Sequence, residues 1–591
     1  MIKYATRFFL FFSFTIITFS LVQAQEDVSA DDAFSLKPKK LIQIGDKLME
    51  EGSNYNAIDY YKAALFATQK KKQQAYLNYQ LGQSNFMMRD YKLAEKYYLS
   101  AINIDMKNKY PLAVYNLANT YKYQAKYEDA KSTFRSFLTD NDENEKVDVE
   151  KRKARLEIKG CDFAIDLQQE KEKYVVENAG NDINGVYSDF GPAFRDGDLF
   201  YGKINSQVVV TLNEEQMTDD QYARIYKNGA KEEQIFNQGN SFVGNPTFSA
   251  NGNTMYYTKC ELIYGTRSQC AIYTSEYDDG EWKKEVKLDD NINNADVNTT
   301  QPHISTDENG IETLYFVAQD RTNGRGGKDI WFAVKNEEGV FQRARNMGYP
   351  INTRYDDVSP FYDENSQILY FSSDGHISIG GLDIFSSQKD EDGDFEEPEN
   401  MMTPLNSSLD DFDFVLNSEG LVGYLVSNRV GTTTLKSATC CDDIFKVTPS
   451  EQKMVLCGLI FEENTRTVSY ESSILLKDGD TDEIIEEIDF TGEEFFFDIE
   501  PDRTYVLFVS HDSFEAESIS INTNGKYKID TLFQDVLLKN RIEESPVEEI
   551  DVVLGKIYYE FNLSKLRADA PDTLAKVLNY MMTHPLCIVE V

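Results

Sequence analysis

The chain changes from one pattern of apolar and polar positions to another near residue 172. From residue 41 to residue 138, three similar segments follow one another at spacings of 36 to 37 residues, and each is long enough for two amphipathic helices. Small and aromatic residues recur together at Gly45, Gly82 and Ala118, at Ala57, Ala94 and Ala130, and at Tyr61, Tyr98 and Phe134. The pattern predicts three helix pairs, and an amphipathic helix within residues 146–170 would cover the open end of their core.

After residue 172 the apolar positions alternate in short runs, which is the pattern of β-strands. Five units follow one another at spacings of 54 to 58 residues, a length that suits a four-stranded propeller blade. The positions in register near the start of the units are Pro192, Pro246, Pro302, Pro360 and Phe414. A later strand in each unit starts with Arg224-Ile225-Tyr226, Ala271-Ile272-Tyr273, Asp329-Ile330-Trp331, Asp383-Ile384-Phe385 or Asp443-Ile444-Phe445.

The exit segments of these units predict how the ring closes. NMGYPINTRYDD and MMTPLNSSLDD each follow a unit, and the related NAGNDINGVYSD at residues 178–189 comes before the first unit. The last unit, which ends near residue 447, lacks such a segment. We therefore expect an N-terminal strand to complete the last blade. About five blades are predicted, with a degenerate sixth copy as the alternative.

Both arrays resemble known families. The helical segments, residues 38–172, resemble tetratricopeptide repeats (TPR), and residues 173–450 resemble the WD40-like (PD40) β-propellers of bacterial envelope proteins. A TPR array usually presents a concave groove to a peptide or a partner helix. Tyr79, Asn116 and Tyr123 are the candidates for lining that groove, and ordinary packing or solvent exposure is the alternative for each of them.

Two further modules are predicted after the propeller. Residues 453–540 alternate in short strands and resemble the carboxypeptidase regulatory-like β-sandwich, a spacer or binding module without a peptidase site. Residues 541–551 form an acidic linker, and residues 552–591 resemble the N-terminal half of an OmpA-like peptidoglycan-binding domain.

The resemblance to the OmpA-like domain covers no ligand residues. In that family the groups that hold the peptidoglycan peptide lie beyond the second strand. We therefore expect peptidoglycan binding only if the domain is complete in the native gene product, of which this chain would be a fragment or a truncated form. The predicted fold class is multidomain: an all-α TPR array, an all-β propeller, a β-sandwich and a partial α/β domain.

The first residues predict export. Lys3 and Arg7 precede an apolar run of about 14 residues, and Val22-Gln23-Ala24 is a small-residue pattern of the kind that signal peptidase cleaves after. We expect a signal peptide over residues 1–24, because the apolar run is shorter than the ~20 residues that span a bilayer.

Net charge makes some partners unfavourable. The chain carries 60 Lys and Arg against 100 Asp and Glu, a formal charge of -40, which would repel phosphate backbones and anionic lipid surfaces. Nucleic acid is therefore not an expected partner, and solubility of a large exported protein is the simpler explanation of the acidity.

Seven cysteines in an exported chain permit disulfides. Cys260 and Cys270 flank a predicted hairpin and are the best candidate pair. The neighbours Cys440 and Cys441 are not expected to bridge each other, since adjacent cysteines do so only with strain. One of them pairing with Cys457 is a weaker hypothesis.

Catalytic motifs are absent from the sequence. The four histidines form no H-x-x-x-H pair, and the chain has neither a G-x-S-x-G elbow nor a C-x-x-C pair. We expect no enzymatic activity and no cofactor, and a structural or channel-lining role for His303. Weak candidates for Ca²⁺ ligands are Asp390, Asp392 and Asp394, but this loop lacks the twelve-residue EF-hand pattern, and a solvated turn is the favoured interpretation.

The order of modules resembles the multidomain OmpA-family proteins of the outer-membrane periplasm, which include a peptidoglycan-associated component of type IX secretion and gliding. The resemblance implies a non-enzymatic periplasmic scaffold, associated with the outer membrane, that binds envelope or secretion proteins through the TPR array and the propeller. The alternatives are a glycan- or Ca²⁺-binding envelope sensor and, less favoured, a propeller hydrolase.

Overall fold

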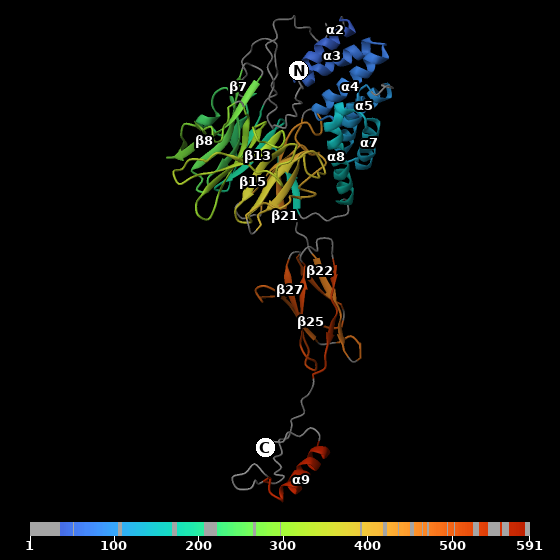
Figure 1. Cartoon of the computed structure of the whole chain (residues 1–591), viewed down its shortest axis with the longest axis vertical. Helices are drawn as coiled ribbons and strands as arrows, with labels where there is room; N and C mark the ends of the chain where they lie inside the picture. The colour runs from blue at the N-terminus through green and yellow to red at the C-terminus, as the bar shows by residue number, and fades with distance from the viewer. Residues whose placement is uncertain are drawn as a thin grey trace. The chain divides into compact units, whose positions relative to one another are not determined.

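The computed structural model divides into two compact units, Met1–Gln452 and Lys453–Val591 (Figure 1). It describes residues 36–584 except for 51, 105–108, 168–173, 206–220, 264–266, 296, 391–392, 418–421, 435–436, 450–453, 464, 470–471, 493, 501–502, 524–530, 542–555 and 558–565. The predicted signal peptide and nearly all of the predicted linker therefore lie outside the described residues.

The first unit begins with paired antiparallel helices, the arrangement of TPR repeats. The helices are α2 (Pro38–Glu50), α3 (Asn54–Ala67), α4 (Lys71–Met87), α5 (Tyr91–Ile104), α6 (Pro111–Lys122), α7 (Tyr127–Asp140) and α8 (Asp148–Leu167). A Cβ atom on Gly45 would lie 2.6 Å from the ring of Tyr61, and one on Gly82 would lie 2.6 Å from the ring of Tyr98. The recurring small residues are thus needed because the aromatic ring of the partner helix occupies the space of a side chain. Helix α8 covers the last pair, as the sequence predicted.

The rest of the first unit consists of five blades of antiparallel strands. The first blade consists of β2 (Asp189–Arg195), β3 (Asp198–Lys203), β4 (Arg224–Lys227) and β5 (Ala230–Lys231), and the second of β6 (Ser241–Phe248), β7 (Thr254–Ile263), β8 (Arg267–Asp278), β9 (Glu281–Trp282) and β10 (Val286–Lys287). The third consists of β11 (Thr299–Thr306), β12 (Glu312–Gln319), β13 (Lys328–Val334) and β14 (Arg345–Asn346), and the fourth of β15 (Asp357–Asp363), β16 (Ile368–Ser373), β17 (Asp383–Gln388) and β18 (Glu399–Asn400). The fifth consists of β19 (Asp411–Leu416), β20 (Gly423–Ser427), β21 (Asp443–Pro449) and β1 (Tyr174–Asn178). The inner strand of each blade lies against the inner strand of the next, and β19 lies against β2, which closes the ring.

The last blade is completed from the other end of the propeller. Strand β1 pairs antiparallel with β21, with Val176 opposite Val447. This confirms the predicted closure and supports five blades among the described residues. Backbone hydrogen bonds thereby join the N-terminal end of the propeller sequence to its last blade.

An asparagine holds the exit segment of each blade in the same way. Asn352 Oδ1 accepts the backbone N–H of Ile330 at 2.9 Å, and Asn352 Nδ2 donates to the carbonyl oxygen of Ile330 at 2.8 Å. The same two-way bond is made by Asn237 to Ile225, Asn293 to Ile272, Asn406 to Ile384 and Asn184 to Ile444. The repeated Ile and Asn positions of the sequence are therefore partners within each blade.

Each inner strand also has a bulge at the position in register, which is proline in four blades and Phe414 in the fifth. The residue before that position adopts a left-handed backbone, and the pairing register shifts there. These residues are Gly191, Asn245, Gln301, Ser359 and Asp413, with φ between 48° and 60°. Proline suits the next position because it has no N–H to donate to a ladder that the bulge interrupts.

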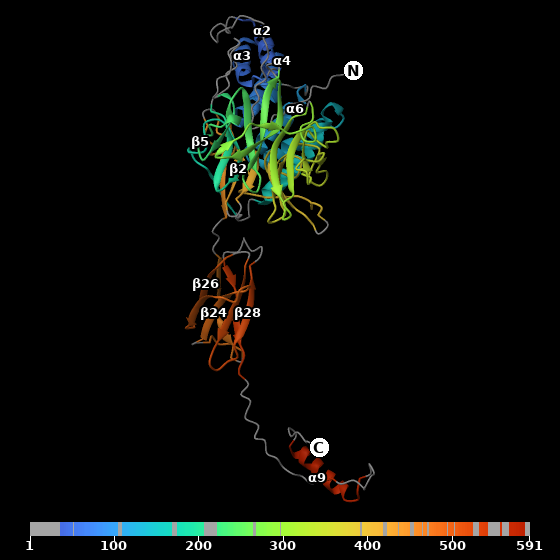
Figure 2. The same ribbon diagram turned by 90° about the vertical axis from the view of Figure 1, so that its left-hand side faces the viewer.

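The second unit is described by itself and contains a β-sandwich (Figure 2). One layer pairs β26 (Phe495–Ile499), β22 (Met454–Gly458) and β29 (Thr531–Phe533), with β23 (Ile460–Glu462) beside β30 (Val536–Leu538), and the other pairs β25 (Ile484–Phe490), β24 (Ser472–Asp478), β27 (Thr504–Ser510) and β28 (Glu517–Asn522). Alternate residues of β27, such as Tyr505, Leu507 and Val509, are buried in the core of the sandwich.

Helix α9 (Ala570–Thr583) also belongs to the second unit. Its apolar side chains Leu574, Leu578 and Met581 are exposed. Residues 558–565 and 585–591 of the segment that resembles an OmpA-like domain lie outside the described residues. Within the described part of the chain, every helix is too short or too polar to cross a bilayer.

Several carboxylates are buried at the ends of propeller strands. Asp357 is fully buried and accepts hydrogen bonds from Ser373 Oγ at 2.6 Å and from the backbone N–H of Thr353 at 2.5 Å. Burial raises the pKa of Asp357 to about 8, and burial also raises the pKa values of Asp189 and Asp383 to about 7.

We predict that the propeller is more stable at pH 5 than at pH 8. Since the pKa of these groups is raised above the unfolded value of ~3.9, their contribution is fully present below pH ~4 and is lost as the pH rises through the folded values of about 7 to 8. Asp357→Asn should reduce the loss of unfolding free energy between pH 5 and pH 8 by on the order of 3 kcal/mol, measured by urea unfolding. The exposed Asp390→Asn is the control, and equal pH dependence of the two variants would refute the prediction.

Candidate functional site

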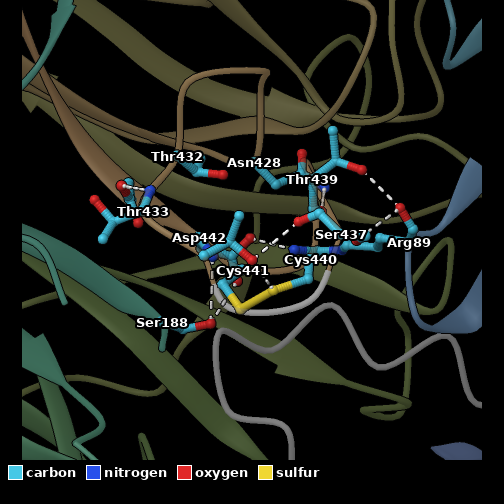
Figure 3. Close-up of a disulfide and its surroundings, with 12 residues drawn as sticks. Arg89, Ser188, Asn428, Thr432, Thr433, Ser437, Thr439, Cys440, Cys441 and Asp442 are labelled. Atoms are coloured by element: carbon cyan, nitrogen blue, oxygen red, sulfur yellow. Dashed lines mark hydrogen bonds and ion pairs between the residues drawn. A yellow bond between two sulfur atoms is a disulfide. The ribbon is translucent and has the colours of Figure 1, made fainter. Parts of the chain in front are cut away.

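The turn between α4 and α5 carries an arginine that reaches into the propeller. Arg89 Nη1 lies 2.5 Å from Asp442 Oδ1, and Arg89 Nη2 lies 3.6 Å from Asp410 Oδ2. Both carboxylates are buried, and burial raises the pKa of Asp410 to about 7 although the positive charge of Arg89 acts to lower it. The backbone carbonyl of Arg89 accepts a hydrogen bond from Thr439 Oγ1 at 2.6 Å (Figure 3). The arginine therefore bonds the propeller through both its side chain and its main chain.

A second group of charges joins α6 and α8 to the propeller. The ammonium of Lys122 is fully buried, forms an ion pair with Glu157 and donates to Ser378 Oγ at 3.3 Å. Lys153 lies 3.0 Å from Asp374 Oδ2 and 3.3 Å from Glu157 Oε1. The carboxylates of Asp374 and Glu157 raise the pKa of Lys153, which overcomes the opposing effect of its burial.

Apolar and backbone contacts fill the space between these charges. Ile379 of the propeller packs into the core formed by α6, α7 and α8, and Leu409 packs into the core formed by α4, α5 and α6. A Cβ atom on Gly160 of α8 would lie 2.3 Å from the carbonyl oxygen of Ser378, so only glycine permits this approach. The helical array and the propeller are thus in direct contact within one unit. We call this contact, between α4–α8 and the loops around residues 374–379, 408–410 and 437–442, the array junction.

The structure places the three predicted groove residues in different surroundings. Tyr123 lies at the array junction, where its carbonyl oxygen accepts from Ser408 Oγ at 3.3 Å. Tyr79 stacks on Tyr110, with ring centroids 5.2 Å apart, and shares an apolar cluster with Tyr123. Asn116 is half-buried on α6, is not part of that cluster, and its carbonyl oxygen accepts from Thr120 Oγ1. Tyr79 is therefore the predicted residue that lies beside other half-buried aromatic rings.

The cysteines give one expected and one unexpected disulfide. Cys260 of β7 and Cys270 of β8 are opposite each other in the ladder and form the predicted disulfide. The expectation for Cys440 and Cys441 was wrong, because the turn before β21 brings their side chains together as a disulfide (Figure 3). Cys457 is a free, buried thiol in β22 of the second unit.

Two of the calcium candidates, Asp390 and Asp394, lie in a hairpin turn after β17. The backbone N–H of Asp394 donates to Asp390 Oδ1 at 3.0 Å, and the N–H of Asp390 donates to the carbonyl oxygen of Asp394 at 2.8 Å. Asp392 lies outside the described residues. In the part of the chain that the structure describes, three or more His, Cys, Asp or Glu residues do not gather into a metal-binding group.

The propeller axis carries a polar ring formed by the left-handed residues of the inner strands. Asp413 accepts hydrogen bonds from the backbone N–H of Gly191 at 2.9 Å and from Ser359 Oγ at 2.5 Å, and Gln301 Nε2 donates to Ser359 Oγ at 3.0 Å. Burial raises the pKa of Asp413 to about 6. Asp413 is the one carboxylate among these five residues, and its partners are groups of the ring itself.

His303 has a structural environment next to this ring. Its Nε2 lies 3.0 Å from the carbonyl oxygen of Tyr362, and its ring meets Phe361 edge to face at 4.9 Å. Burial lowers the pKa of His303 to about 4, so the imidazole is neutral at physiological pH.

Comparisons with known proteins concern the fold alone. No protein-family model and no curated protein matches the chain. Among solved structures, the C-terminal TPR-containing domain of a protein described as a Plasmodium falciparum FK506-binding protein is 19% identical, with a TM-score of 0.20, and the match covers 24% of this chain and 95% of that one. A protein of unknown function from Dyadobacter fermentans is 10% identical (TM-score 0.30; 47% and 99% covered), and an endo-arabinase from Bacteroides thetaiotaomicron is 11% identical (TM-score 0.29; 47% and 98% covered). The helices and sheets described above, and not these likenesses, give the chain its TPR-like helical region followed by a β-rich region with a propeller.

Of the residues at the array junction, the sequence pointed only to Tyr123, which was expected to line a groove, and not to the charged residues. Arg89 and Asp442 are 353 positions apart, and neither belongs to a repeated position of its array. A weak signal existed in Gly160, since glycine in a helix interior costs about 1 kcal/mol relative to alanine and so indicates a close contact.

We predict that Arg89→Ala weakens the array junction. The substitution leaves Asp410 and Asp442 buried without their cation, which should lower the free energy of unfolding by about 3–5 kcal/mol at pH 8, measured by urea unfolding. Adding Asp442→Asn should recover part of this loss, because one uncompensated charge is then removed. The control is Arg135→Ala on the exposed face of α7, with an expected change within about 0.5 kcal/mol. Equal midpoints for Arg89→Ala and Arg135→Ala would contradict a role of the ion pairs in the junction.

Proposed function

We propose that this protein is a non-enzymatic periplasmic scaffold of the outer membrane that holds envelope protein complexes, with the type IX secretion or gliding machinery as the candidate system. The observation that carries the proposal is the array junction. Two repeat arrays, each with a large surface, are joined by the ion pairs Arg89–Asp442 and Lys153–Asp374 and by apolar contacts into a single unit. Such a unit suits a docking platform, because repeat arrays present extended surfaces whose shape changes little on binding.

The propeller axis supports a binding role over hydrolysis. Glycoside hydrolysis generally uses two carboxylates on either side of the scissile bond. The axial ring contributes Asp413 alone, and the hydrogen bonds of this carboxylate are directed at neighbouring residues of the ring. Asp189, Asp357 and Asp411, two residues earlier on three of the inner strands, are buried and bonded to Lys203, Ser373 and Arg429 of the propeller.

The proposed location and partners rest on the sequence. Residues 1–24 have the pattern of a signal peptide, and the order of modules resembles OmpA-family proteins such as PorE, a peptidoglycan-associated component of type IX secretion. A link to peptidoglycan belongs to the proposal only where the OmpA-like domain is complete in the native gene product. The chain would then connect cell wall to the proteins bound by the two arrays.

The proposed partner surface of the helical array is the aromatic cluster of Tyr76, Tyr79 and Tyr110. The rings of Tyr76 and Tyr110 lie 6.1 Å apart, those of Tyr79 and Tyr110 lie 5.2 Å apart, and all three residues are half-buried. Partly exposed tyrosines contribute strongly to protein interfaces because they bury a large area at a small cost in side-chain entropy.

We predict that a photo-crosslinking amino acid at Tyr79 captures an envelope protein in living cells. The same residue at Tyr55, which is 51% exposed on α3 outside this cluster, is the control and should give no such product. Tyr79→Ala should reduce co-purification of the captured protein about tenfold, while Tyr55→Ala should leave it unchanged.

Two results would refute the proposed scaffold function. One is the absence of a Tyr79-specific product in cells. The other is turnover: release of reducing sugar from polysaccharides by the purified protein, abolished by Asp413→Asn, would identify a hydrolase. Saturable Ca²⁺ binding that Asp390→Asn abolishes, without a protein partner, would instead support the sensor.

A further inference from the structure

One end of the helical array carries an unusual concentration of positive charge. Helices α2 and α3 are antiparallel, so the start of α2, the end of α3 and the start of α4 lie at the same end of the first helix pair, where Leu36 and Leu65 pack on one core. The charged and aromatic residues at this end are Lys37, Lys39, Lys40, Lys70, Lys71, Lys72 and Phe66, all exposed. We call this set the lysine end.

Among the residues that the structure describes, no acidic side chain pairs with these lysines. Residues 60–89 contain no Asp or Glu, although the chain as a whole has 100 of them in 591 residues. Among the described residues, none of the six lysines forms an ion pair with a carboxylate. Their charge is therefore available to an external anion.

The helix termini add to the positive potential at the lysine end. Neither α2 nor α4 has an acidic residue in its first turn, and Lys70, at the N-cap of α4, makes no side-chain hydrogen bond to the helix. Lysines beside the positive ends of two helix dipoles destabilise those helices. Helices α3, α5 and α6 likewise have no acidic residue in the first turn, whereas α7 and α8 begin with acidic residues, as their dipoles favour. A local electrostatic cost of this kind is typical of a binding surface.

An apolar side chain projects from the same surface. Phe66, near the end of α3, is 83% exposed. Exposed aromatic residues among lysines are typical of proteins that rest on a membrane, where the ring enters the boundary between headgroups and acyl chains and the lysines remain among the phosphates. An acidic peptide would use the lysines but would leave this ring without a specific role.

The overall negative charge does not prevent such a contact. Arg89, at the other end of α4, bonds the propeller, so the 17 residues of α4 separate the lysine end from the array junction by about 25 Å. This exceeds twice the Debye length of about 8–10 Å at physiological ionic strength. An anionic surface at the lysine end is therefore largely screened from the acidic propeller.

We propose that the lysine end binds the surface of an anionic phospholipid membrane. Six lysines and two helix N-termini supply the attraction to phosphate groups, and Phe66 supplies an apolar anchor. The inference goes beyond the proposed scaffold and does not depend on it, since vesicle binding requires no protein partner.

The test is sedimentation of the purified protein with vesicles of 30% phosphatidylglycerol and 70% phosphatidylcholine. We expect binding that is absent with pure phosphatidylcholine and is lost when the salt concentration is raised to several times the physiological value. The variant K70Q/K71Q/K72Q should bind at least about tenfold more weakly, and Phe66→Ala about fivefold more weakly.

The matched control is K283Q/K284Q/K287Q, which removes the same charge from exposed lysines of the propeller and should leave binding unchanged. Thermal unfolding of each variant shows whether it is folded. Three outcomes would overturn the proposal: no binding to phosphatidylglycerol vesicles, equal weakening by the two triple variants, or binding of a polyglutamate peptide without binding of vesicles.

Discussion

The buried charges of the array junction are the constraint on which the first unit depends. Arg89 of the helical array is the cation beside Asp410 and Asp442, which are buried in the propeller, and Lys153 of α8 pairs with Asp374. The two buried carboxylates are costly without the arginine, so the helical array and the propeller stabilise each other in the arrangement that brings these groups together. A platform built in this way differs from two domains joined by a linker, because its surfaces keep a fixed relation.

The array junction also keeps the lysine end of the helical array apart from the acidic propeller. The turns at one end of the helix pairs hold the propeller, while the lysine end lies about 25 Å away along α4. An acidic protein can thereby present a basic surface, because screening limits each region to its own neighbours. Net charge alone, which disfavours anionic lipid, is too coarse to describe this molecule.

Much of the fold could be predicted from the sequence because each repeat places the same residue types at the same contacts. Gly45 and Gly82 mark the positions where the rings of Tyr61 and Tyr98 pack directly against the partner helix. The exit segment that precedes the first blade, at residues 178–189, predicted the pairing of β1 with β21. The array junction could not be predicted in this way. Its contacts join residues hundreds of positions apart, and the chemistry of Arg89 or Lys122 alone does not distinguish an exposed cation from a buried one.

The most direct test of the account is to cut the chain between its two arrays. A specific protease site placed within residues 168–173 would allow cleavage of the folded protein between α8 and β1, followed by size-exclusion chromatography. The account predicts that the helical fragment and the rest of the protein elute together at physiological salt, because the array junction holds them without a covalent connection. Elution of the intact helical fragment as a separate folded species would contradict it.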